Sequence, residues 1–296
     1  MTLHSRNYAG EEDYGHMRRL LIDVLGRGGL PVYATIGDID WWRAMDTDLP
    51  LEVIQLWFDG DRPVAFAWPV DDQVDCVVHP DYPALHDETL TWGEEEYRRR
   101  MGRQPEKPLR AWSYTGDTVR TAALAARGYR RTDDGLVFYT QPVVAAESPP
   151  LPAGYAFDHV RGEADVARRV AVHRNAFAPS RMTADKMRTV MATPTYRPEL
   201  DLVIVAPDES YAAFTLIWLD EANRAGVYEP VGVASEHQRR GLGYAIMREG
   251  IRRLSQFGAQ TVCVQTGFDN TAAQALYEKA GFVELDRNYA WARPTE

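Results

Sequence analysis

The chain has few cysteines, no long apolar run and a shortage of basic residues, and each absence excludes a class of protein. Cys76 and Cys263 are the only cysteines among 296 residues, too few for a disulfide framework or a cysteine-rich metal cluster. The longest apolar stretches have the length of a strand, so a membrane partner is not expected. The first residues, MTLHSRNYAGEEDYGHM, lack an apolar core and a small-residue cleavage site, so no secretory signal is expected. A cytoplasmic location follows as the expectation.

The shortage of basic residues is concentrated in the first half. Residues 1–146 hold 16 Lys and Arg against 24 Asp and Glu, a net charge of −8, whereas the remainder holds 17 against 19, a net charge of −2. Nucleic-acid-binding proteins usually carry a basic surface, so no nucleic-acid partner is expected. An acidic half would attract a cationic substrate over a long range, although solubility is the simpler explanation of the charge.

Length and proline content predict two domains. Hydrophobic residues make up 45% and charged residues 26%, as in ordinary globular proteins, and 296 residues suit two domains of about 150 residues. Residues 149–152 contain three prolines, which make a semi-rigid extended linker. The predicted domains are therefore residues 1–146 and 147–296.

A repeat crosses this linker at a constant offset of 153 residues. Residues 109–113 and 262–266 both read as strands. Residues 117–129 and 270–282 each read as an Asx-type cap, a helix, a glycine at the helix end and an aromatic residue. Two copies of one fold follow from this agreement.

The second copy reads as helices and strands in the order β-β-β-α-β-α-β after two helices, which indicates a mixed sheet with helices on its faces. The expected helices and strands are, in order, 164–177 (helix), 185–191 (helix), 202–205, 211–219 and 226–233 (strands), 240–257 (helix), 261–265 (strand), 271–280 (helix) and 282–291 (strand).

A glycine-containing turn, Gln238-Arg239-Arg240-Gly241-Leu242-Gly243, joins the third of these strands to a long amphipathic helix. Backbone N–H groups at such a helix start point at one spot, where the positive end of the helix dipole favours an anion. Gly241 and Gly243 would let phosphate oxygens approach the backbone, and Arg239 and Arg240 add positive charge. The motif is neither a nucleoside-triphosphate loop nor a dinucleotide fingerprint. A glycine-rich helix entry with incidental arginines is the alternative.

The second motif, Asn270 to Phe282, begins about 30 residues downstream, after one strand. With it, residues 155–293 resemble the GNAT superfamily of acetyltransferases, whose signature is a Gln/Arg-x-x-Gly-x-Gly/Ala turn and an Asn-x-x-Ala-x-x-Leu-Tyr-x-x-x-Gly-Phe helix. The resemblance implies an α/β fold of two tandem acyl-CoA N-acyltransferase domains, each with a mixed, mostly antiparallel sheet flanked by helices. It also implies that acetyl-CoA is the co-substrate, with its pantetheine arm along Val231, Gly232 and Val233, its pyrophosphate on the 238–243 turn and Asn270 near its reactive end.

Acyl transfer to an amine needs a neutral amine, a stabilised oxyanion and a proton for the leaving thiolate. Tyr277 matches the tyrosine that supplies this proton in the family, although a core aromatic is the alternative. Glu229 is the candidate base, because period-two alternation would put it on one face with Val231 and Val233. A salt-bridging glutamate is the alternative reading of Glu229, and His237 is the second candidate base.

The sequence gives little support to a cysteine nucleophile, a hydrolase or a metal site. Cys263 in Val-Cys-Val reads as buried core rather than as a nucleophile. No Gly-x-Ser-x-Gly elbow indicates a hydrolase, and no histidine pair has metal-ligand spacing, so no metal is expected.

The first copy lacks the corresponding groups. At the same offset Asp117 replaces Asn270 and Leu124 replaces Tyr277, and the turn counterpart, residues 77–87, has prolines and acids where glycines would be needed. We expect a degenerate copy that serves as scaffold or as one wall of the acceptor pocket. Tandem members of the family with one degenerate half, such as mycothiol synthase-like enzymes, have this layout. Six of the eight tryptophans lie in this half. They could line an aromatic pocket for an amine, but core packing is the preferred interpretation.

The sequence thus predicts an N-acetyltransferase that acts on the primary amine of a small molecule. A protein or peptide N-acetyltransferase and a non-catalytic acyl-CoA-binding regulatory module are the alternatives. A homodimer is left open.

Overall fold

The computed structural model describes residues 2–45, 49–102, 107–145 and 147–293, and its second half contains the predicted succession of elements. Every predicted range is confirmed to within two residues at each end. The elements are α5 (Glu163–Ala176), α6 (Ala184–Met191), β8 (Asp201–Val205), β9 (Tyr211–Asp220), β10 (Ala225–Val233), α7 (Leu242–Gln256), β11 (Thr261–Gly267), α8 (Thr271–Lys279) and β12 (Val283–Arg293). Strand β7 (Ala156–His159) and the short 3-10 turns η2 (Pro198–Leu200) and η3 (Ser235–His237) are additional.

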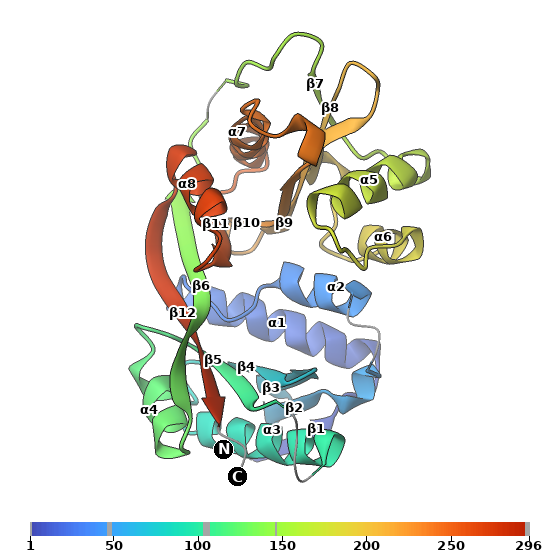
Figure 1. Cartoon of the computed structure of the whole chain (residues 1–296). Helices are drawn as coiled ribbons and strands as arrows, with labels where there is room; N and C mark the ends of the chain where they lie inside the picture. Colours follow the sequence, from blue (N-terminus) through green and yellow to red (C-terminus); the bar gives the residue numbers. More distant parts are fainter. Residues whose placement is uncertain (1, 46–48, 103–106, 146, 294–296) are drawn as a thin grey trace. The chain divides into compact units, whose positions relative to one another are not determined.

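The first half has a similar order of elements (Figure 1). They are β1 (Leu3–Asn7), α1 (Glu11–Gly28), α2 (Ile36–Met45), η1 (Leu51–Val53), β2 (Gln55–Asp59), β3 (Arg62–Val70), β4 (Gln73–Val78), α3 (Leu85–Met101), β5 (Leu109–Tyr114), α4 (Thr118–Ala126) and β6 (Arg130–Pro142). The described part of the chain contains no helix that is both long and apolar enough to cross a membrane.

The repeated segments share their local geometry. The Asp117 side chain accepts a hydrogen bond from the Arg120 backbone N–H at 2.9 Å and so caps α4. The Asn270 side chain accepts one from the Ala273 N–H at 3.2 Å and so caps α8. A glycine with positive φ follows each helix, at 83° for Gly128 and 100° for Gly281. Equivalent caps at both helix ends explain why the repeat is readable in the sequence.

Two compact units exchange segments along the chain. Unit 1 consists of Met1–Thr35, Asp46–Phe138 and Leu285–Glu296, and unit 2 of Ile36–Met45 and Tyr139–Glu284. Helix α2 therefore belongs to unit 2, although it lies early in the first half. The predicted ranges 1–146 and 147–296 describe consecutive copies along the chain and stay a prediction. Ala146, in the linker, lies outside the described residues.

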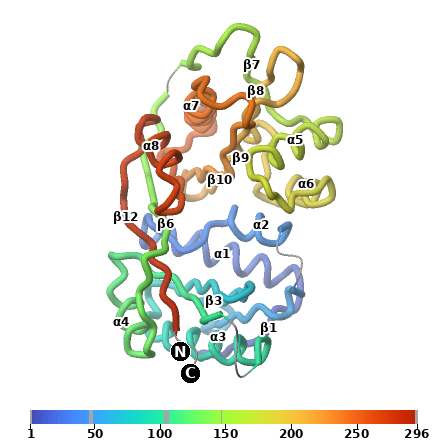
Figure 2. The backbone as a smooth tube through the Cα atoms, viewed as in Figure 1, coloured from blue at the N-terminus to red at the C-terminus, as the bar shows by residue number. Residues whose placement is uncertain are grey.

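The final strand of each half reaches beyond its own unit: most of β12 lies in unit 1, and the last residues of β6 lie in unit 2. The strand order is β1-β2-β3-β4-β5-β12-β6 in unit 1 and β6-β11-β10-β9-β8-β7 in unit 2. Strand β12 pairs antiparallel with β5, from Asn288↔Tyr114 to Arg293↔Leu109. The end of β6 bonds to β11 through Thr140, whose Oγ1 donates to the Val262 carbonyl at 3.1 Å. Figure 2 shows β6 in green next to β12 in red.

In unit 2 the central strands are covered on both faces, by α5 and α6 on one side and by α7 on the other (Figure 1). All ten residues of β9 are buried, as expected for a strand that is covered twice. The predicted apolar positions of α7 are confirmed as core, with exposures of 3% or less. They are Leu242, Ala245, Ile246, Ile251 and Leu254. Trp57 and Trp68 are likewise buried in unit 1, which agrees with a packing role.

Candidate functional site

The candidate site begins where the parallel strands β10 and β11 separate. They pair only at Ala225↔Thr261, Gly226↔Val262 and Val227↔Cys263, although β10 continues to residue 233 and β11 to residue 267. On its other edge β10 has a bulge after Tyr228, and the ladder with β9 resumes at Val231↔Thr215. The edge of β10 from residues 231 to 233 thus faces the opening between the strands, where an extended ligand can form main-chain hydrogen bonds.

The turn before α7 has the backbone geometry of an anion site. Arg239 and Gly241 have left-handed φ values of 59° and 79°, and the first helical hydrogen bond runs from the Ala245 N–H to the Gly241 carbonyl at 3.0 Å. In the described part of the chain, the N–H groups of residues 239–243 make no backbone hydrogen bond. A Cβ at Gly241 would meet no atom within 4 Å, so the surface in front of the turn is open. Arg239 and Arg240 are exposed beside it.

Two further glycines in this region are needed for close packing. A Cβ at Gly232 would lie 2.6 Å from Phe214 Cε1, and one at Gly243 would lie 3.1 Å from Leu276 Cδ2. Gly243 thus allows α7 to approach α8, a reason that the sequence did not reveal. The two glycines hold the strand, the turn and α8 close together.

Helix α8 carries Tyr277, the candidate acid, and its side chain is buried. Tyr277 is 6% exposed, and its ring lies edge-on to Tyr139 at 5.9 Å between centroids. Burial, with smaller contributions from Glu229 and Tyr139, raises the pKa of the Tyr277 phenol to about 12. The phenol therefore keeps its proton at neutral pH and can act as a donor. Asn270 is exposed, and its carbonyl oxygen caps α8.

Glu229 lies in the β10 bulge, and its position corrects one expectation. Simple alternation would put Glu229, Val231 and Val233 on one face, but the extra residue in the bulge breaks the alternation between Tyr228 and Val231. Val231 and Val233 therefore share the face of Tyr228, whose hydroxyl donates to the Met247 carbonyl in α7. By the same register Glu229 belongs to the opposite face, on which α2 and α5 pack.

The Glu229 carboxyl is partly buried and has an acidic neighbour. This neighbour is Asp38 of α2. Burial, together with the negative charge and the hydrogen bond of Asp38, raises the pKa of Glu229 well above its ordinary value. The Glu229 backbone carbonyl accepts a hydrogen bond from the Trp218 indole Nε1 at 2.9 Å.

Asp38 is the residue of the site that sequence analysis missed. It is 6% exposed and lies 191 positions before Glu229, so only the tertiary structure joins the two. The available signal was weak: Asp38 and Asp40 stand in a tryptophan- and isoleucine-rich helix, which is unusual for charged groups.

His237 and Cys263 take structural positions. His237 Nδ1 and the Tyr155 hydroxyl lie 2.9 Å apart, and their rings meet edge-on at 5.7 Å, so the second candidate base is engaged beside the turn. Cys263 is 1% exposed, as predicted for core, and burial raises the pKa of its thiol. Within the described ranges, no group of three or more His, Cys, Asp or Glu side chains could hold a metal ion.

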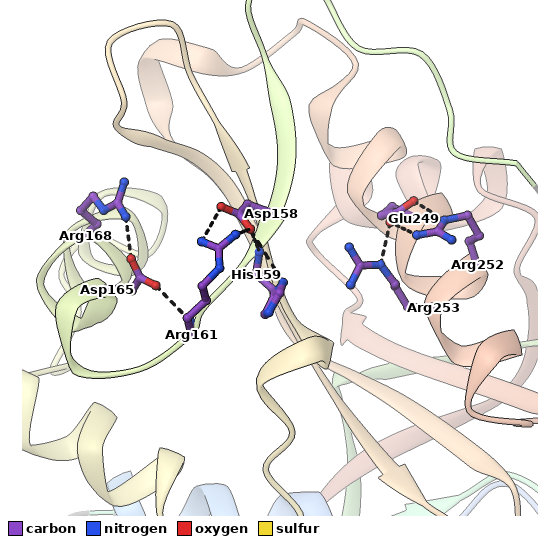
Figure 3. A network of polar contacts seen from close by, with 8 residues as sticks. All are labelled: Asp158, His159, Arg161, Asp165, Arg168, Glu249, Arg252 and Arg253. Carbon is purple, nitrogen blue, oxygen red and sulfur yellow. Dashed lines mark hydrogen bonds and ion pairs between the residues drawn. The ribbon is translucent and has the colours of Figure 1, made fainter.

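Two ion-pair networks brace the helices of unit 2 (Figure 3). Glu249 of α7 accepts from Arg252 and Arg253 at 2.6–2.8 Å and from the Ser148 hydroxyl at 2.7 Å. Burial alone would raise the pKa of Glu249, but these hydrogen bonds outweigh it and lower the pKa to about 2. In the second network Asp165 accepts from the Arg161 N–H and the Arg168 guanidinium. Glu249 thus links α7 to Ser148, and Asp165 links the start of α5 to Arg161 before it.

The equivalent opening in unit 1 is filled by Arg120. This residue is 2% exposed; its Nε donates to the Trp112 carbonyl of β5 at 2.6 Å and its Nη1 to the Cys76 carbonyl of β4 at 2.9 Å. Strands β4 and β5 pair only at Gln73↔Arg110, so they diverge as β10 and β11 do. The guanidinium thus occupies main-chain acceptors on both sides of the opening.

Comparisons with known proteins agree with this geometry. Residues 173–282 match the acetyltransferase (GNAT) family. The mycothiol acetyltransferase of Kineococcus radiotolerans is 33% identical over 183 residues, which cover 60% of this chain and 59% of that protein. The chain thus spans about three fifths of the length of the curated relatives that it matches.

Two solved structures share the fold over almost the whole chain. A GCN5-related N-acetyltransferase from Sphaerobacter thermophilus has a TM-score of 0.68 at 21% identity and covers 99% of this chain and 97% of its own. A tandem GNAT protein from the clavulanic acid biosynthesis pathway has a TM-score of 0.67 at 16% identity and covers 98% of each chain. The predicted fold class, two tandem domains of this kind with mixed sheets and flanking helices, is confirmed.

Proposed function

We propose that this chain, whose residues 173–282 belong to the acetyltransferase (GNAT) family, transfers an acetyl group from acetyl-CoA to the primary amine of a small molecule. The observation that carries the proposal is the separation of β10 from β11 beside the open turn at the start of α7. The free main-chain edge of β10 and the anion site of the turn then lie next to each other. A ligand with an extended amide arm and a pyrophosphate requires this arrangement.

The residues of the turn suit the pyrophosphate. After Gln238, whose N–H donates to the Ser235 carbonyl, Arg239, Arg240, Gly241, Leu242 and Gly243 supply N–H groups at the positive end of a 15-residue helix. The left-handed backbone at Arg239 and Gly241 lets neighbouring N–H groups converge, and the open space at Gly241 leaves room for phosphate oxygens. The β10 edge, Val231 to Val233, would pair with the pantetheine amides. Asn270, at the start of α8, would lie near the reactive end.

Tyr277 and Glu229 suit the two proton transfers. The thioester supplies the acetyl group, and the amine nitrogen forms the new bond to its carbonyl carbon as the bond to sulfur breaks. Tyr277 donates its proton to the departing thiolate, since a phenol with a pKa of about 12 is still protonated at that moment. Glu229 takes up a proton from the amine, and its raised pKa makes its ionised form a stronger base. A backbone N–H of β10 would stabilise the oxyanion.

The first copy is proposed to bind no cofactor. Arg120 already donates to the strand carbonyls at the equivalent opening, and Leu124, at the place of Tyr277, has no proton to donate. One acetyl-CoA site per chain follows.

A small-molecule acceptor is favoured because the relatives that match are named mycothiol acetyltransferases. A protein or peptide amine is the second acceptor class. A regulatory module that binds acyl-CoA without turnover is the alternative from another class.

The test is release of free thiol from acetyl-CoA with a panel of amines: glucosamine, spermidine, tyramine and a short peptide with an unblocked N-terminus. Turnover of a small amine supports the proposal, and turnover of the peptide alone favours the second class. Tight binding of acetyl-CoA without any turnover favours the regulatory module. In Tyr277→Phe, turnover should fall about 100-fold while acetyl-CoA affinity stays unchanged, because only the proton donor is lost. Full activity would remove Tyr277 from the acid role.

A further inference from the structure

Helix α8 enters the core of unit 2 through Tyr277. All nine residues of α8 are described, and Tyr277 is the one buried residue among them. Its ring meets two other aromatic rings. Tyr139 of β6 lies edge-on to it at 5.9 Å between centroids, and Phe282, just after the end of α8, lies at 6.2 Å with the planes at 52°. Figure 1 shows the end of β6 next to α8.

Tyr139 is itself fixed between β6 and α8. It is 1% exposed, and its hydroxyl donates to Glu278 Oε1, one residue after Tyr277, over a long 3.4 Å. Two residues further along β6, and so on the same face, Gln141 donates to the Ala280 carbonyl. The end of β6 thus packs against the C-terminal end of α8, where the candidate acid lies.

The Tyr277 hydroxyl is not held by a hydrogen bond. Among the described residues none bonds to it, and this oxygen is not one of the buried atoms that lack a partner. The small exposed part of Tyr277 therefore includes its hydroxyl, the end that would meet the thiolate. The phenol can turn about two side-chain bonds, so the contacts of its ring are what direct the hydroxyl.

The equivalent pair in unit 1 has neither ring. At the constant offset of 153 residues, Leu124 of α4 replaces Tyr277, and Ala292 of β12 replaces Tyr139. Both Leu124 and Ala292 lie in unit 1. Leucine has no proton to direct, and alanine supplies no ring. The aromatic residue on the final strand thus occurs in the unit that has the candidate acid.

We propose that Tyr139 is a positioning residue for acyl transfer, whose ring directs the Tyr277 hydroxyl at the departing thiolate. This role rests on the proposed function and gives the first copy a task in it, because the final strand of that copy carries Tyr139. Proton transfer requires donor and acceptor atoms about 3 Å apart and aligned, so a small displacement of the phenol lowers the rate strongly.

The test measures single turnovers with enzyme in excess over acetyl-CoA, using the panel amine that the unaltered protein acetylates fastest. Tyr139→Leu removes the ring that contacts Tyr277, so the rate of the chemical step should fall about tenfold. The affinity for acetyl-CoA and the KM for the amine should stay unchanged, because a residue that is 1% exposed does not touch either ligand. Tyr139→Phe keeps the ring and should keep most of the rate.

Phe138→Leu is the matched control. Phe138 is 4% exposed and faces the other side of β6, where its ring meets Tyr114 edge-on at 5.9 Å. This variant also loses a buried ring, so its thermal stability should fall about as far, with an unchanged rate of transfer. If Tyr139→Leu does not fold, Tyr139→Met, which keeps more of the volume, takes its place. An equal loss of rate in Phe138→Leu, or a normal rate in Tyr139→Leu, overturns the proposal.

A double variant shows whether Tyr139 acts through Tyr277. In Tyr277→Phe the proton donor is already lost, so adding Tyr139→Leu should lower the rate further by less than about twofold. If the two losses multiply instead, the ring of Tyr139 acts by another route, and the positioning role is excluded.

NMR separates this role from the proposed function. With carbon-13 in the tyrosine rings, the Tyr277 signal is identified by its absence in Tyr277→Phe, and its ring-flip rate is measured without any substrate. Loss of the neighbouring ring should let Tyr277 flip about ten times faster. If no amine is acetylated, the proposed function fails, but a faster flip in Tyr139→Leu still supports the positioning. An unchanged flip rate refutes it, whatever the enzyme assay gives.

Discussion

Replacing Gly37 by alanine should loosen the contact between α2 and β9. The added Cβ would lie 2.2 Å from Trp218 Cγ and 2.4 Å from Trp218 Cβ. Carbon atoms in contact are about 3.5–4.0 Å apart, so helix and indole must separate by about 1.3 Å or more. Trp218 cannot easily turn away, because it is 1% exposed and its indole N–H is bonded to Glu229.

The expected cost follows from two opposing effects. Overpacking of a buried contact costs about 1–3 kcal/mol. Gly37 is the second residue of α2, so alanine regains less than the roughly 1 kcal/mol that it gains over glycine in a helix interior. A net loss of about 1–2 kcal/mol results, which lowers Tm by about 2–8 °C for a domain of this size.

Gly15→Ala in α1 is the matched control. Its Cβ would lie 3.5 Å from Arg19 Nη1, an ordinary contact at the end of a flexible side chain. Calorimetric melts of both variants should therefore show a lower Tm for Gly37→Ala and an equal or higher Tm for Gly15→Ala. If Gly37→Ala melts at or above the temperature of the unaltered protein, the reasoning about the packing of α2 is refuted.

Three further predictions concern the cofactor turn, its stoichiometry and the acid stability of unit 2. Gly241→Ala and Gly258→Ala both place alanine at a left-handed φ, 79° and 75°, at opposite ends of α7, so each should cost about 1 kcal/mol of stability, but only the first should weaken acetyl-CoA binding in calorimetry. One acetyl-CoA should bind per chain, since Arg120 fills the opening in unit 1, and a stoichiometry of two would contradict that account. Burial, assisted by Arg169, lowers the pKa of His173 to about 4 in the folded protein, so the unfolded chain binds a proton that the folded one does not between about pH 6.5 and pH 4. The free energy of unfolding should therefore fall as the pH falls through that window. In denaturant unfolding, the difference in this free energy between the unaltered protein and His173→Gln should shrink by about 3 kcal/mol; a difference that does not change with pH would exclude the role of His173.

Local motifs carried most of the predictable information. The apolar period of α7 and the caps at Asp117 and Asn270 act within a few residues of themselves, so element bounds came out to within two residues. The Gln238–Gly243 turn was readable for the same reason, because its glycines and the helix that follows are contiguous. The roles of Gly241 and Asn270 toward a cofactor stay predictions.

The sequence alone also misplaced one side chain. Alternation assigned Glu229 to the face of Val231 and Val233, but a bulge in β10 shifts the register by one residue. The alternation of residues along the strand does not reveal the extra residue. The pairing of β10 with β9 determines where it lies.

What the sequence determined by itself is therefore the set of elements, the duplication and the turn that resembles a cofactor site. The tertiary structure alone decided that most of β12 lies in unit 1, that the end of β6 and α2 lie in unit 2, and that Asp38 acts on Glu229. The physical reason is the separation along the chain of the residues that determine each feature. Caps, turns and periodicity are set by neighbouring residues, whereas a contact across 191 positions depends on how whole elements bury their apolar faces, and no short stretch of sequence encodes that.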